Sequence, residues 1–396
     1  MTKLLAYMPT PGGLTGAPRR LLTLAAALRE HDVLVCVATC ADSELIQVAR
    51  AEDYKTVPVD AAGVLGLRQG ALFGGGVLFR LRVLADLLRQ NWRLFRCIRK
   101  QQVNAVWIRG SKGIAFGGIG AVLGRRPLLW DIDYELPSKG LIHWLHRFGL
   151  WAANAVICQY HAAPHEIFGD RLATLYQRKF HTITPGINLT DVEVFRDKRK
   201  YRSRADDAPF VILQVGTICE RKNQAVIIEA LSQAMEHGSG TDWELWLAYD
   251  EIQLAGFENA LIEHGLENNV RLLGWRDDVK DLMVKADILV MPSKAEGVPN
   301  AVQEAMAIGL PVLVSQAGGM PEIVKEGGTG WIIDMHDTSE WARRILWCAR
   351  HQPATTAVGE AASAYAFEHF GTEGWGREYA RIVRAVIPGS ASPGRH

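Results

Sequence analysis

The stretch from residue 286 to residue 330 constrains the fold most, because it alternates short apolar runs with glycine-bearing loops. Residues 288–291 read ILVM and residues 311–315 read PVLVS. Such continuous apolar runs are typical of strands buried in a parallel sheet. A helix is predicted between them, over residues 301–308, because Asn300 and the glutamine three residues later have the spacing of a capping box. This order of elements predicts an α/β fold.

Two carboxylates accompany the predicted strand and helix. Glu296 lies in the loop at the carboxyl end of the strand, and Glu304 lies on the helix that follows. Ligands of open parallel sheets bind outside the carboxyl ends of the strands, where free N–H groups at a helix start also attract anions. Two carboxylates there suit the hydroxyl-rich groups that flank a phosphate, such as a ribose and a sugar. For these two acids alone, ordinary solvated side chains are the commoner explanation.

The residues around the two acids make the pattern more specific. The stretch closely resembles the nucleotide-sugar site of the retaining glycosyltransferases of family four, which have the two-domain GT-B fold. The matching residues are Pro292-Ser293, Glu296-Gly297, Pro299-Asn300, Glu304-Ala305-Met306-Ala307, Gly309, Pro311-Val312, Gly318-Gly319, Pro321-Glu322 and Gly328-Thr329-Gly330. The resemblance implies an α/β protein with two Rossmann-like parallel-sheet domains that face each other across a cleft. It also implies a C-terminal helix that crosses back to the N-terminal domain.

The resemblance further implies roles for the residues of this stretch. The acid Glu296 and the backbone that follows it would bind hydroxyls of the donor sugar, and Glu304 would accept hydrogen bonds from the ribose. The expected donor-binding residues here are Glu296, Gly297, Val298, Pro299, Asn300 and Glu304.

Length and composition agree with two domains. The chain has 396 residues, which is more than one ordinary hydrophobic core accommodates. Its 48% hydrophobic and 22% charged residues are typical of a globular protein, and no apolar run is long enough to span a membrane. The six cysteines show neither a disulfide framework nor zinc-site spacing, which predicts a cytoplasmic location.

The predicted domain boundaries follow the strand and helix patterns. They give an N-terminal acceptor-binding domain over residues 1–190, a polar linker over 191–208, a C-terminal nucleotide-sugar-binding domain over 209–370, a crossover helix over 371–387 and a disordered tail over 388–396. Charge is divided unevenly: residues 1–200 contain 27 lysines and arginines against 16 acids, whereas the remaining residues contain 17 against 27. This asymmetry predicts different partners for the two halves.

The N-terminal half contributes three further candidate site residues. Gly12 and Gly13 lie in a loop that lacks the GxGxxG spacing of dinucleotide sites, but family members carry a Gly-Gly there that approaches the donor or the acceptor. A tight turn without a ligand is the alternative. Asp131-Ile132-Asp133 looks like the DxD metal motif of another glycosyltransferase architecture, which the family-four resemblance argues against. Asp133 is instead expected near the position of a family histidine that the chain lacks.

A second loop, GTICERKN at residues 216–223, follows a predicted strand and precedes a predicted helix. Relatives have Gly-Arg at its start, whereas this chain has Thr217 at the arginine position and retains Lys222 near the end. The resemblance implies that Lys222, with Thr217 or Arg221, stabilises the charge on a departing diphosphate. Trp275, after a later predicted strand, either stacks on the nucleotide base or packs within the protein.

Together these features predict a retaining glycosyltransferase that moves a sugar from a nucleotide diphosphate sugar to a glycan or lipid-linked acceptor. Glu296, Lys222 and Asp133 are the predicted catalytic residues, and neither a metal ion nor a cofactor is expected. The same fold also hosts phosphorylases and nucleotide-sugar epimerases, and a catalytically silent partner subunit is a third alternative. The base, the sugar, the acceptor and the linkage stay open.

A basic helix predicted over residues 77–100 points to a membrane partner. At 100° per residue, an apolar arc lies beside a stripe of basic residues. The stripe consists of Arg82, Arg89, Arg93, Arg96 and Lys100. This pattern is typical of peripheral binding to an anionic surface, here the inner face of the cytoplasmic membrane. A core-packed helix with a solvated charged face is the alternative, and no nucleic-acid-binding module accompanies the stripe.

Overall fold

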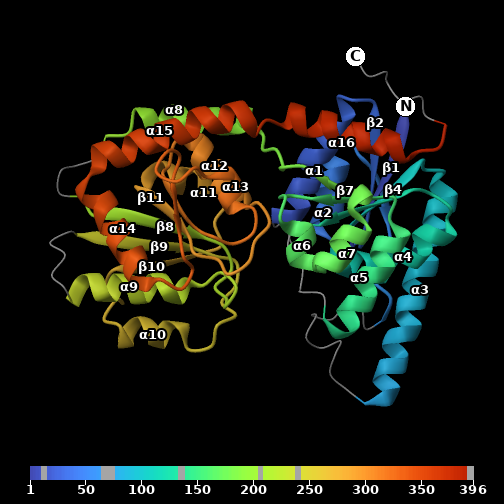
Figure 1. The fold of residues 1–396 in the computed structure, drawn as a ribbon, viewed down its shortest axis with the longest axis horizontal. Coiled ribbons are helices and arrows are strands. Elements are labelled where there is room, and N and C mark those ends of the chain that lie inside the picture. Colours follow the sequence, from blue (N-terminus) through green and yellow to red (C-terminus); the bar gives the residue numbers. More distant parts are fainter. Residues whose placement is uncertain (10–15, 64–75, 133–138, 204–207, 237–241, 390–396) are drawn as a thin grey trace. The chain divides into compact units, whose positions relative to one another are not determined.

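The computed structural model describes residues 1–9, 16–63, 76–132, 139–203, 208–236 and 242–389, and the chain forms two compact units (Figure 1). Unit 1 consists of Met1–Gly186 together with Thr372–His396, and unit 2 consists of Ile187–Gly371. Each unit has its own sheet, and the paired strands of both sheets run parallel. The predicted α/β architecture of two Rossmann-like units is thereby confirmed.

Unit 1 alternates strands and helices around a sheet with the strand order β3-β2-β1-β4-β5-β6-β7. The strands are β1 (Thr2–Tyr7), β2 (Val33–Thr39), β3 (Lys55–Pro58), β4 (Ala105–Arg109), β5 (Leu128–Ile132), β6 (Ala155–Cys158) and β7 (Phe180–Thr182). The α-helices are α1 (Gly16–Arg29), α2 (Glu44–Ala51), α3 (Val77–Gln101), α4 (Gly110–Leu123), α5 (Gly140–Ala152), α6 (Ala163–Phe168), α7 (Asp170–Leu175) and α16 (Thr372–Val386). The helix predicted over residues 371–387 corresponds to α16, and it belongs to unit 1.

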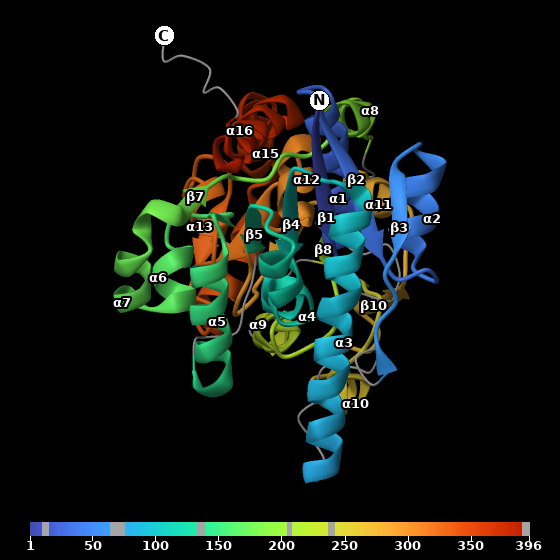
Figure 2. The same ribbon diagram turned by 90° about the vertical axis from the view of Figure 1, so that its right-hand side faces the viewer.

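Alternate residues of the central strand face two separate hydrophobic cores in unit 1. Leu4 and Ala6 of β1 pack with α1 and α16, whereas Leu5 and Tyr7 pack with α3 and α4. Helices therefore cover both faces of the sheet, and Figure 2 shows α3, α4 and α5 side by side over one of them. Because neither face meets water, β1 has a nearly continuous apolar sequence.

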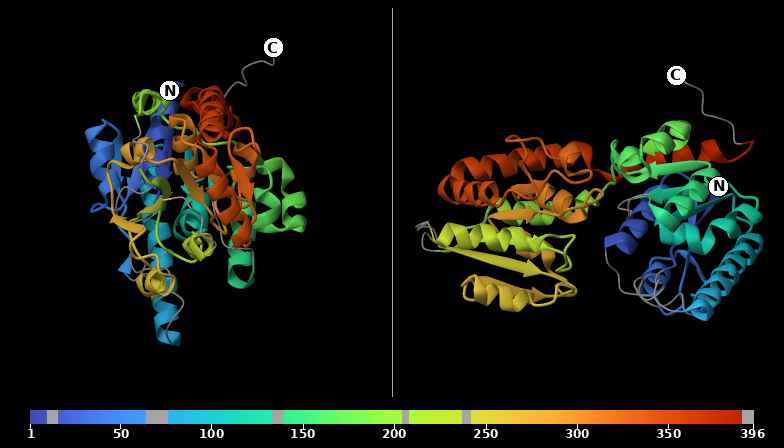
Figure 3. Two further views of the ribbon diagram at one scale, coloured as in Figure 1. Left: turned by 90° about the vertical axis from the view of Figure 1, so that its left-hand side faces the viewer. Right: turned by 60° about the horizontal axis from the view of Figure 1, so that its bottom comes forward.

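Unit 2 has a sheet with the strand order β10-β9-β8-β11-β12-β13. The strands are β8 (Phe210–Val215), β9 (Trp243–Ala248), β10 (Val270–Gly274), β11 (Ile288–Met291), β12 (Val312–Ser315) and β13 (Trp331–Ile333). The helices are α8 (Leu189–Lys200), α9 (Gln224–Glu236), α10 (Phe257–Glu263), α11 (Val279–Lys285), α12 (Asn300–Ile308), α13 (Met320–Ile323), α14 (Thr338–Arg350) and α15 (Gln352–His369). One core lies against α8, α11, α12 and α15, and the other lies against α9, α10 and α14 (Figure 3).

The segment predicted as a linker is a packed helix over much of its length. α8 spans Leu189–Lys200, contacts α11 and α12, and is part of unit 2. Arg199 holds it in place, because its guanidinium donates hydrogen bonds to the carbonyls of Ala286 and Gly309, at 2.7 and 3.0 Å. The boundary between the units accordingly falls after Gly186. Arg199, one of the charged residues that suggested a linker, thus satisfies carbonyl groups of unit 2. Residues 390–396 of the predicted tail lie outside the described residues.

The start of α12 also differs from the prediction. Asn300 is the first residue of the helix, and Pro299 occupies the N-cap position with φ −70° and ψ 130°. A proline has no N–H to donate the reciprocal bond of a capping box, so Gln303 does not complete one. The helix end is as predicted, because Gly309 adopts a left-handed conformation with φ 86°.

His146 of α5 makes the stability of unit 1 depend on pH. Its side chain is fully buried against Trp130 and Phe168, and its Nε2 lies 2.8 Å from Oγ of Ser111. Burial lowers the pKa of His146 from 6.5 to about 4. Between these values the unfolded chain binds a proton that the folded unit excludes, so the free energy of unfolding decreases as pH falls. We expect a loss of about 3 kcal/mol from this residue across the window, and none above it.

Chemical denaturation between pH 6.5 and pH 4 measures this effect. A His146→Gln variant keeps a hydrogen-bonding side chain but does not titrate, so its unfolding free energy is expected to fall less steeply over the same range. Equal pH dependence in the two proteins would contradict the assignment to His146.

Candidate functional site

Two loops of unit 2 meet where the order of the strands reverses. β8 and β11 are neighbours in the sheet, although β9 and β10 separate them in the chain. Their carboxyl ends form a topological switch point, which is where open parallel sheets bind ligands. The loop after β8 carries Arg221 and Lys222, and the loop after β11 carries Glu296. The backbone also joins the loops, because the N–H of Lys294 donates to the carbonyl of Arg221 at 2.7 Å.

Glu296 contacts both cations of the other loop. Nη1 of Arg221 donates to Oε1 of Glu296 at 2.7 Å, and Nζ of Lys222 lies 2.8 Å from the same oxygen. The side chains of Lys222 and Glu296 are only 12% and 11% exposed. The sequence named each of these residues as a candidate, but it did not predict that they contact one another. We call Arg221, Lys222 and Glu296 the switch-point cluster.

The electrostatics of the switch-point cluster favour an anionic ligand. Burial by itself raises the pKa of Glu296, but the positive charges of Lys222 and Arg221 outweigh it and hold the pKa below its usual range. The carboxylate is therefore ionised at neutral pH, and the three side chains together carry one net positive charge. Such a cluster, half-enclosed at the carboxyl edge of a sheet, suits a phosphate group better than a neutral ligand.

Two glycines allow the loops to approach this closely. Gly216 has φ +129°, and a Cβ at that position would lie 2.9 Å from Cε of Lys222. Gly318 has φ +58°, and its Cβ would lie 1.8 Å from the carbonyl oxygen of Glu296. The next residue, Gly319, donates its N–H to the carbonyl of Gly297 at 2.9 Å. The Gly318-Gly319 turn therefore supports the backbone of the loop that carries Glu296.

Other residues orient the loop after β8. The hydroxyl of Thr217 donates to Oδ1 of Asp250 at 2.6 Å. Asn223 has φ +55°, and its amide donates to the carbonyls of Pro292 and Met335 at 3.1 and 2.9 Å. Sequence reasoning missed these roles of Asp250 and Asn223. The signal for Asn223 was its place after Lys222, where asparagine tolerates the left-handed backbone that precedes the helix.

The remaining candidates of unit 2 lie on three different elements. Val298 is buried in the core, so its side chain is not open to a ligand. Asn300 begins α12, and Glu304 lies half-buried one turn further along that helix. Trp275 follows the edge strand β10 and is 52% exposed, and its indole N–H donates to Asp277 at 3.1 Å. The contribution of these residues to ligand binding stays a prediction.

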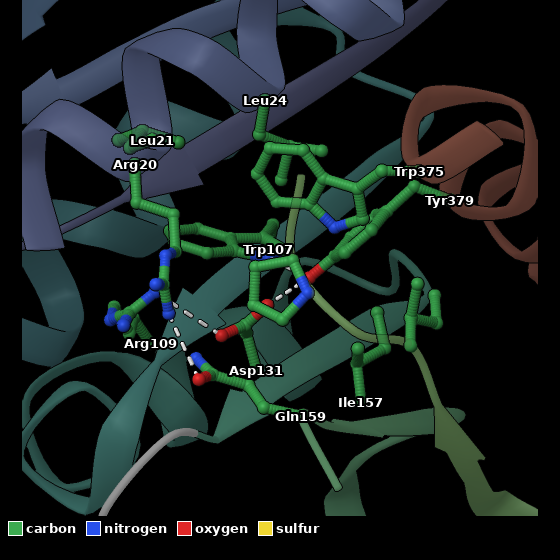
Figure 4. Close-up of a pocket in the computed structure, with 12 residues that line it drawn as sticks. Arg20, Leu21, Leu24, Trp107, Arg109, Asp131, Ile157, Gln159, Trp375 and Tyr379 are labelled. Atoms are coloured by element: carbon green, nitrogen blue, oxygen red, sulfur yellow. Dashed lines mark hydrogen bonds and ion pairs between the residues drawn. The ribbon is translucent and has the colours of Figure 1, made fainter. Parts of the chain in front are cut away.

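Gly12, Gly13 and Asp133 lie outside the described residues. Asp131, the first acid of the DxD-like pattern, lies near the end of β5 on the wall of a small pocket of unit 1 (Figure 4). It accepts a hydrogen bond from the hydroxyl of Tyr379 and lies 3.4 Å from Nη1 of Arg109. Burial and the charge of Asp131 raise the pKa of Tyr379 well above its usual value, so the phenol stays protonated and donates. Asp131 of β5 thus links α16 to the sheet through a hydrogen bond with Tyr379.

Among the residues that the structure describes, no group of three or more histidine, cysteine, aspartate or glutamate side chains is placed to hold a metal ion.

Fold and site define an α/β protein of two Rossmann-like units whose second unit has a phosphate-compatible switch point. Residues 195–365 match the family described as Glycosyl transferases group 1, and the match includes the whole switch-point cluster. This match confirms the family-four resemblance of the sequence.

Curated relatives show the same similarity. The amylovoran biosynthesis glycosyltransferase AmsK of Erwinia amylovora is 29% identical over 211 residues, which are 50% of this chain and 51% of that protein. The UDP-Gal:alpha-D-GlcNAc-diphosphoundecaprenol alpha-1,3-galactosyltransferase of Escherichia coli is 25% identical over 64% of this chain and 68% of the relative. The chain thus spans about half the length of AmsK.

Solved structures resemble the chain over nearly its whole length. HepE of Anabaena in complex with UDP has a TM-score of 0.73 at 19% identity, covering 97% of this chain and 100% of that one. Sucrose-phosphate synthase of Thermosynechococcus elongatus has a TM-score of 0.75 at 18% identity, covering 98% and 99%. At these identities the likeness shows the fold, and it confirms the predicted two-domain architecture.

Proposed function

We propose that the protein is a retaining glycosyltransferase that moves a sugar from a nucleotide diphosphate sugar to a glycan or lipid-linked acceptor. The switch-point cluster carries this proposal, because it places two cations and one ionised carboxylate at the ligand-binding edge of a group 1 glycosyltransferase domain. Cations suit the diphosphate of such a donor, and a carboxylate suits the hydroxyls of its sugar.

The candidate residues of unit 2 have different roles in the proposed reaction. Lys222 and Arg221 stabilise the negative charge that develops on the departing diphosphate. Glu296 holds their ammonium and guanidinium groups in place and accepts hydrogen bonds from the donor sugar. Glu304 accepts hydrogen bonds from the ribose. The bond from sugar to phosphate breaks as the acceptor oxygen attacks the same face of the sugar, and a phosphate oxygen takes the proton of the acceptor.

The relatives support the choice of donor and acceptor. The solved neighbours include HepE in complex with UDP and with UDP-glucose, and the Escherichia coli relative is named for transfer from UDP-Gal to a diphosphoundecaprenol-linked sugar. Amylovoran and lipopolysaccharide core biosynthesis enzymes are also among the relatives. We therefore assign a uridine diphosphate sugar as the donor, and a growing polysaccharide or lipid-linked sugar bound by unit 1 as the acceptor.

Thermal-shift measurements with a panel of nucleotide diphosphates and their sugars test the donor, because a ligand that binds only the folded protein raises the unfolding temperature. The best ligand is then incubated with lipid-linked sugars, and NMR identifies the anomer formed. We expect stabilisation by uridine diphosphate and a product with the donor's anomeric configuration. Release of free nucleotide and epimerised sugar without an acceptor would identify an epimerase instead. The absence of stabilisation by every donor would favour a silent partner subunit.

We expect the reaction to proceed without a divalent metal ion. Lys222 and Arg221 supply positive charge at the diphosphate, and Asp131 already binds Arg109 and Tyr379. EDTA should leave the transfer rate unchanged within error, with a manganese-dependent glycosyltransferase assayed in parallel as the control. A rate that is abolished by EDTA and restored by manganese or magnesium would revive the DxD interpretation of Asp131 and Asp133.

We further propose that the protein works in the cytoplasm, at the inner face of the cytoplasmic membrane, where a lipid-linked acceptor is anchored. No described helix is long and apolar enough to cross a bilayer. The basic stripe of α3, namely Arg82, Arg89, Arg93, Arg96 and Lys100, is exposed to solvent, as attraction to anionic headgroups requires.

A further inference from the structure

Helix α3 exposes apolar side chains and buries polar ones over its first four turns. Its outward row consists of Leu78, Leu81, Leu84, Leu88 and Trp92, each between 54% and 84% exposed. The spacing of three or four residues places this row on one side of the helix. On its inward side, Asp86, Gln90 and Asn91 are at most 3% exposed. A core-packed helix with a solvated polar face would have the opposite distribution.

The inward polar side chains form hydrogen bonds with other segments of unit 1. Nε2 of Gln90 donates to the hydroxyl of Tyr7 at 2.8 Å, and Oε1 of Gln90 accepts the N–H of Ala62 at 2.9 Å. Asn91 accepts the N–H of Gly120 at 3.0 Å and donates to the carbonyl of Ala115 at 3.0 Å. These bonds fix the rotation of α3. The leucines therefore cannot turn inward without breaking a buried hydrogen-bond network.

The neighbouring helices also expose apolar side chains. α4 packs against both α3 and α5, and the three helices lie side by side (Figure 2). α4 exposes Ile119 and Leu123, at 42% and 54%. α5 exposes Leu141, Trp144 and Trp151, at 73%, 66% and 60%. We call the exposed apolar residues of α3, α4 and α5 the apolar face. Exposed apolar side chains gathered on three adjacent helices are typical of an interaction site.

The charge next to the apolar face has one sign. The only acid of α3 is Asp86, which is buried and lies 2.8 Å from Nη1 of Arg89. All the other charged residues of the helix are basic, and those of the stripe are exposed. A second copy of the chain would bring two arginine stripes together, which opposes self-association through this face. Anionic lipid headgroups complement it, and tryptophans flanked by arginines are suited to the boundary between headgroups and acyl chains.

We propose that the apolar face inserts into the headgroup–acyl boundary of an anionic lipid bilayer, so that unit 1 is held by hydrophobic burial as well as by charge. This inference rests on the proposed function only for the nature of the acceptor. The exposed apolar and buried polar side chains of α3 are observed independently of that function. Charge attraction at a surface weakens as salt shortens the Debye length, whereas burial of leucine and tryptophan does not. Binding that persists at high salt is the signature that separates insertion from simple electrostatic adhesion.

Vesicle flotation with the full-length protein tests insertion. The vesicles contain phosphatidylcholine alone or phosphatidylcholine with phosphatidylglycerol, at low and at high salt. One variant combines Leu84→Gln with Leu88→Gln, and another combines Trp144→Gln with Trp151→Gln. A matched control combines Ile262→Gln with Leu175→Gln, because these residues are 64% and 68% exposed but lie on α10 and α7. A third variant reverses the charges of Arg89, Arg93 and Arg96 with glutamate.

The native protein and the matched control should bind the anionic vesicles and keep part of that binding at high salt. Each apolar-face variant should bind about tenfold more weakly at both salt concentrations, because the removed side chains no longer enter the acyl region. The charge-reversed variant should bind more weakly than the native protein, and this difference should be larger at low salt than at high salt. Native binding that disappears entirely at high salt, or equal binding by the apolar-face variants and the native protein, would overturn insertion. Insertion would also be overturned if the native protein did not bind vesicles but formed a dimer that the apolar-face variants disrupt.

A donor measurement separates this inference from the proposed function. The apolar face belongs to unit 1 and the switch-point cluster to unit 2. The apolar-face variants should therefore show the same thermal stabilisation by the donor nucleotide as the native protein. Loss of vesicle binding with donor binding intact would leave the proposed function standing, whereas vesicle binding without any donor binding would count against that function alone.

Discussion

Replacing Lys222 by alanine is expected to lower the turnover of the proposed sugar transfer by about ten- to a thousandfold. Nζ of Lys222 lies 2.8 Å from Glu296 at the switch point of unit 2, and its side chain is only 12% exposed. An ammonium fixed in this way needs no rearrangement to stabilise a departing diphosphate. Arg221 remains in the variant, which is why a residual rate is expected. Steady-state assays of transfer and of donor hydrolysis measure the effect.

Lys294→Ala is the matched control for this experiment. Lys294 lies in the loop of Glu296, but its side chain is 37% exposed and its Nζ lies 3.4 Å from the exposed Glu220. Its removal should change the rate by less than about twofold, because exposed ion pairs contribute little. Thermal unfolding of both variants shows whether the domain remains folded. An unchanged rate in a folded Lys222→Ala protein would show that the loop after β8 does not bind the diphosphate.

The fold was predictable because its main determinants are local. Short apolar runs such as residues 288–291 identify strands buried on both faces, and glycines such as Gly309 identify the helix ends. The alternation of these elements predicts an α/β fold. The length of the chain and the family resemblance indicate the two units. The details that failed depend on tertiary contacts. Residues 191–208 look like a solvated linker until Arg199 is seen to satisfy the carbonyls of α11 and α12.

The sequence indicated a set of candidate site residues but not their arrangement. The resemblance to family four, carried by the residues around Glu296 and Glu304 and by Lys222 before a helix, indicated the two loops. The contacts of Arg221 and Lys222 with Glu296 depend on the adjacency of β8 and β11, which are separated in the sequence. A motif within one segment does not contain that information.

The polarity of α3 shows the same limit for a surface. The sequence contains the apolar arc and the basic stripe, but it does not say which side of the helix faces the sheet. The hydrogen bonds of Gln90 and Asn91 decide it, and both depend on partners from other segments, Tyr7 and Gly120. Hydrophobic periodicity alone would place the leucines inside, because apolar helix faces usually pack in cores.

Replacing Gly318 by alanine is expected to reduce both the stability of unit 2 and the rate of transfer. Gly318 has φ +58°, and its added Cβ would lie 1.8 Å from the carbonyl oxygen of Glu296. No alanine fits without displacement of the loop backbone. Backbone strain and overpacking together should cost about 3 kcal/mol or more. The displaced loop carries Glu296 away from Lys222 and Arg221, and misplacement of about 1 Å in a catalytic group can lower the rate about a hundredfold.

Gly327→Ala separates strain from collision, because Gly327 also has a positive φ, +68°, but nothing lies within 4 Å of its added Cβ. The control should lose only about 1 kcal/mol, from the left-handed backbone alone, and should keep the native transfer rate. Chemical denaturation and steady-state kinetics of the two variants measure the difference. If Gly318→Ala were no less stable and no less active than Gly327→Ala, the Gly318-Gly319 turn could not be what holds Glu296 in place. The larger loss in Gly318→Ala follows from the close approach of two backbone segments at this position. That approach leaves no room for any side chain at residue 318.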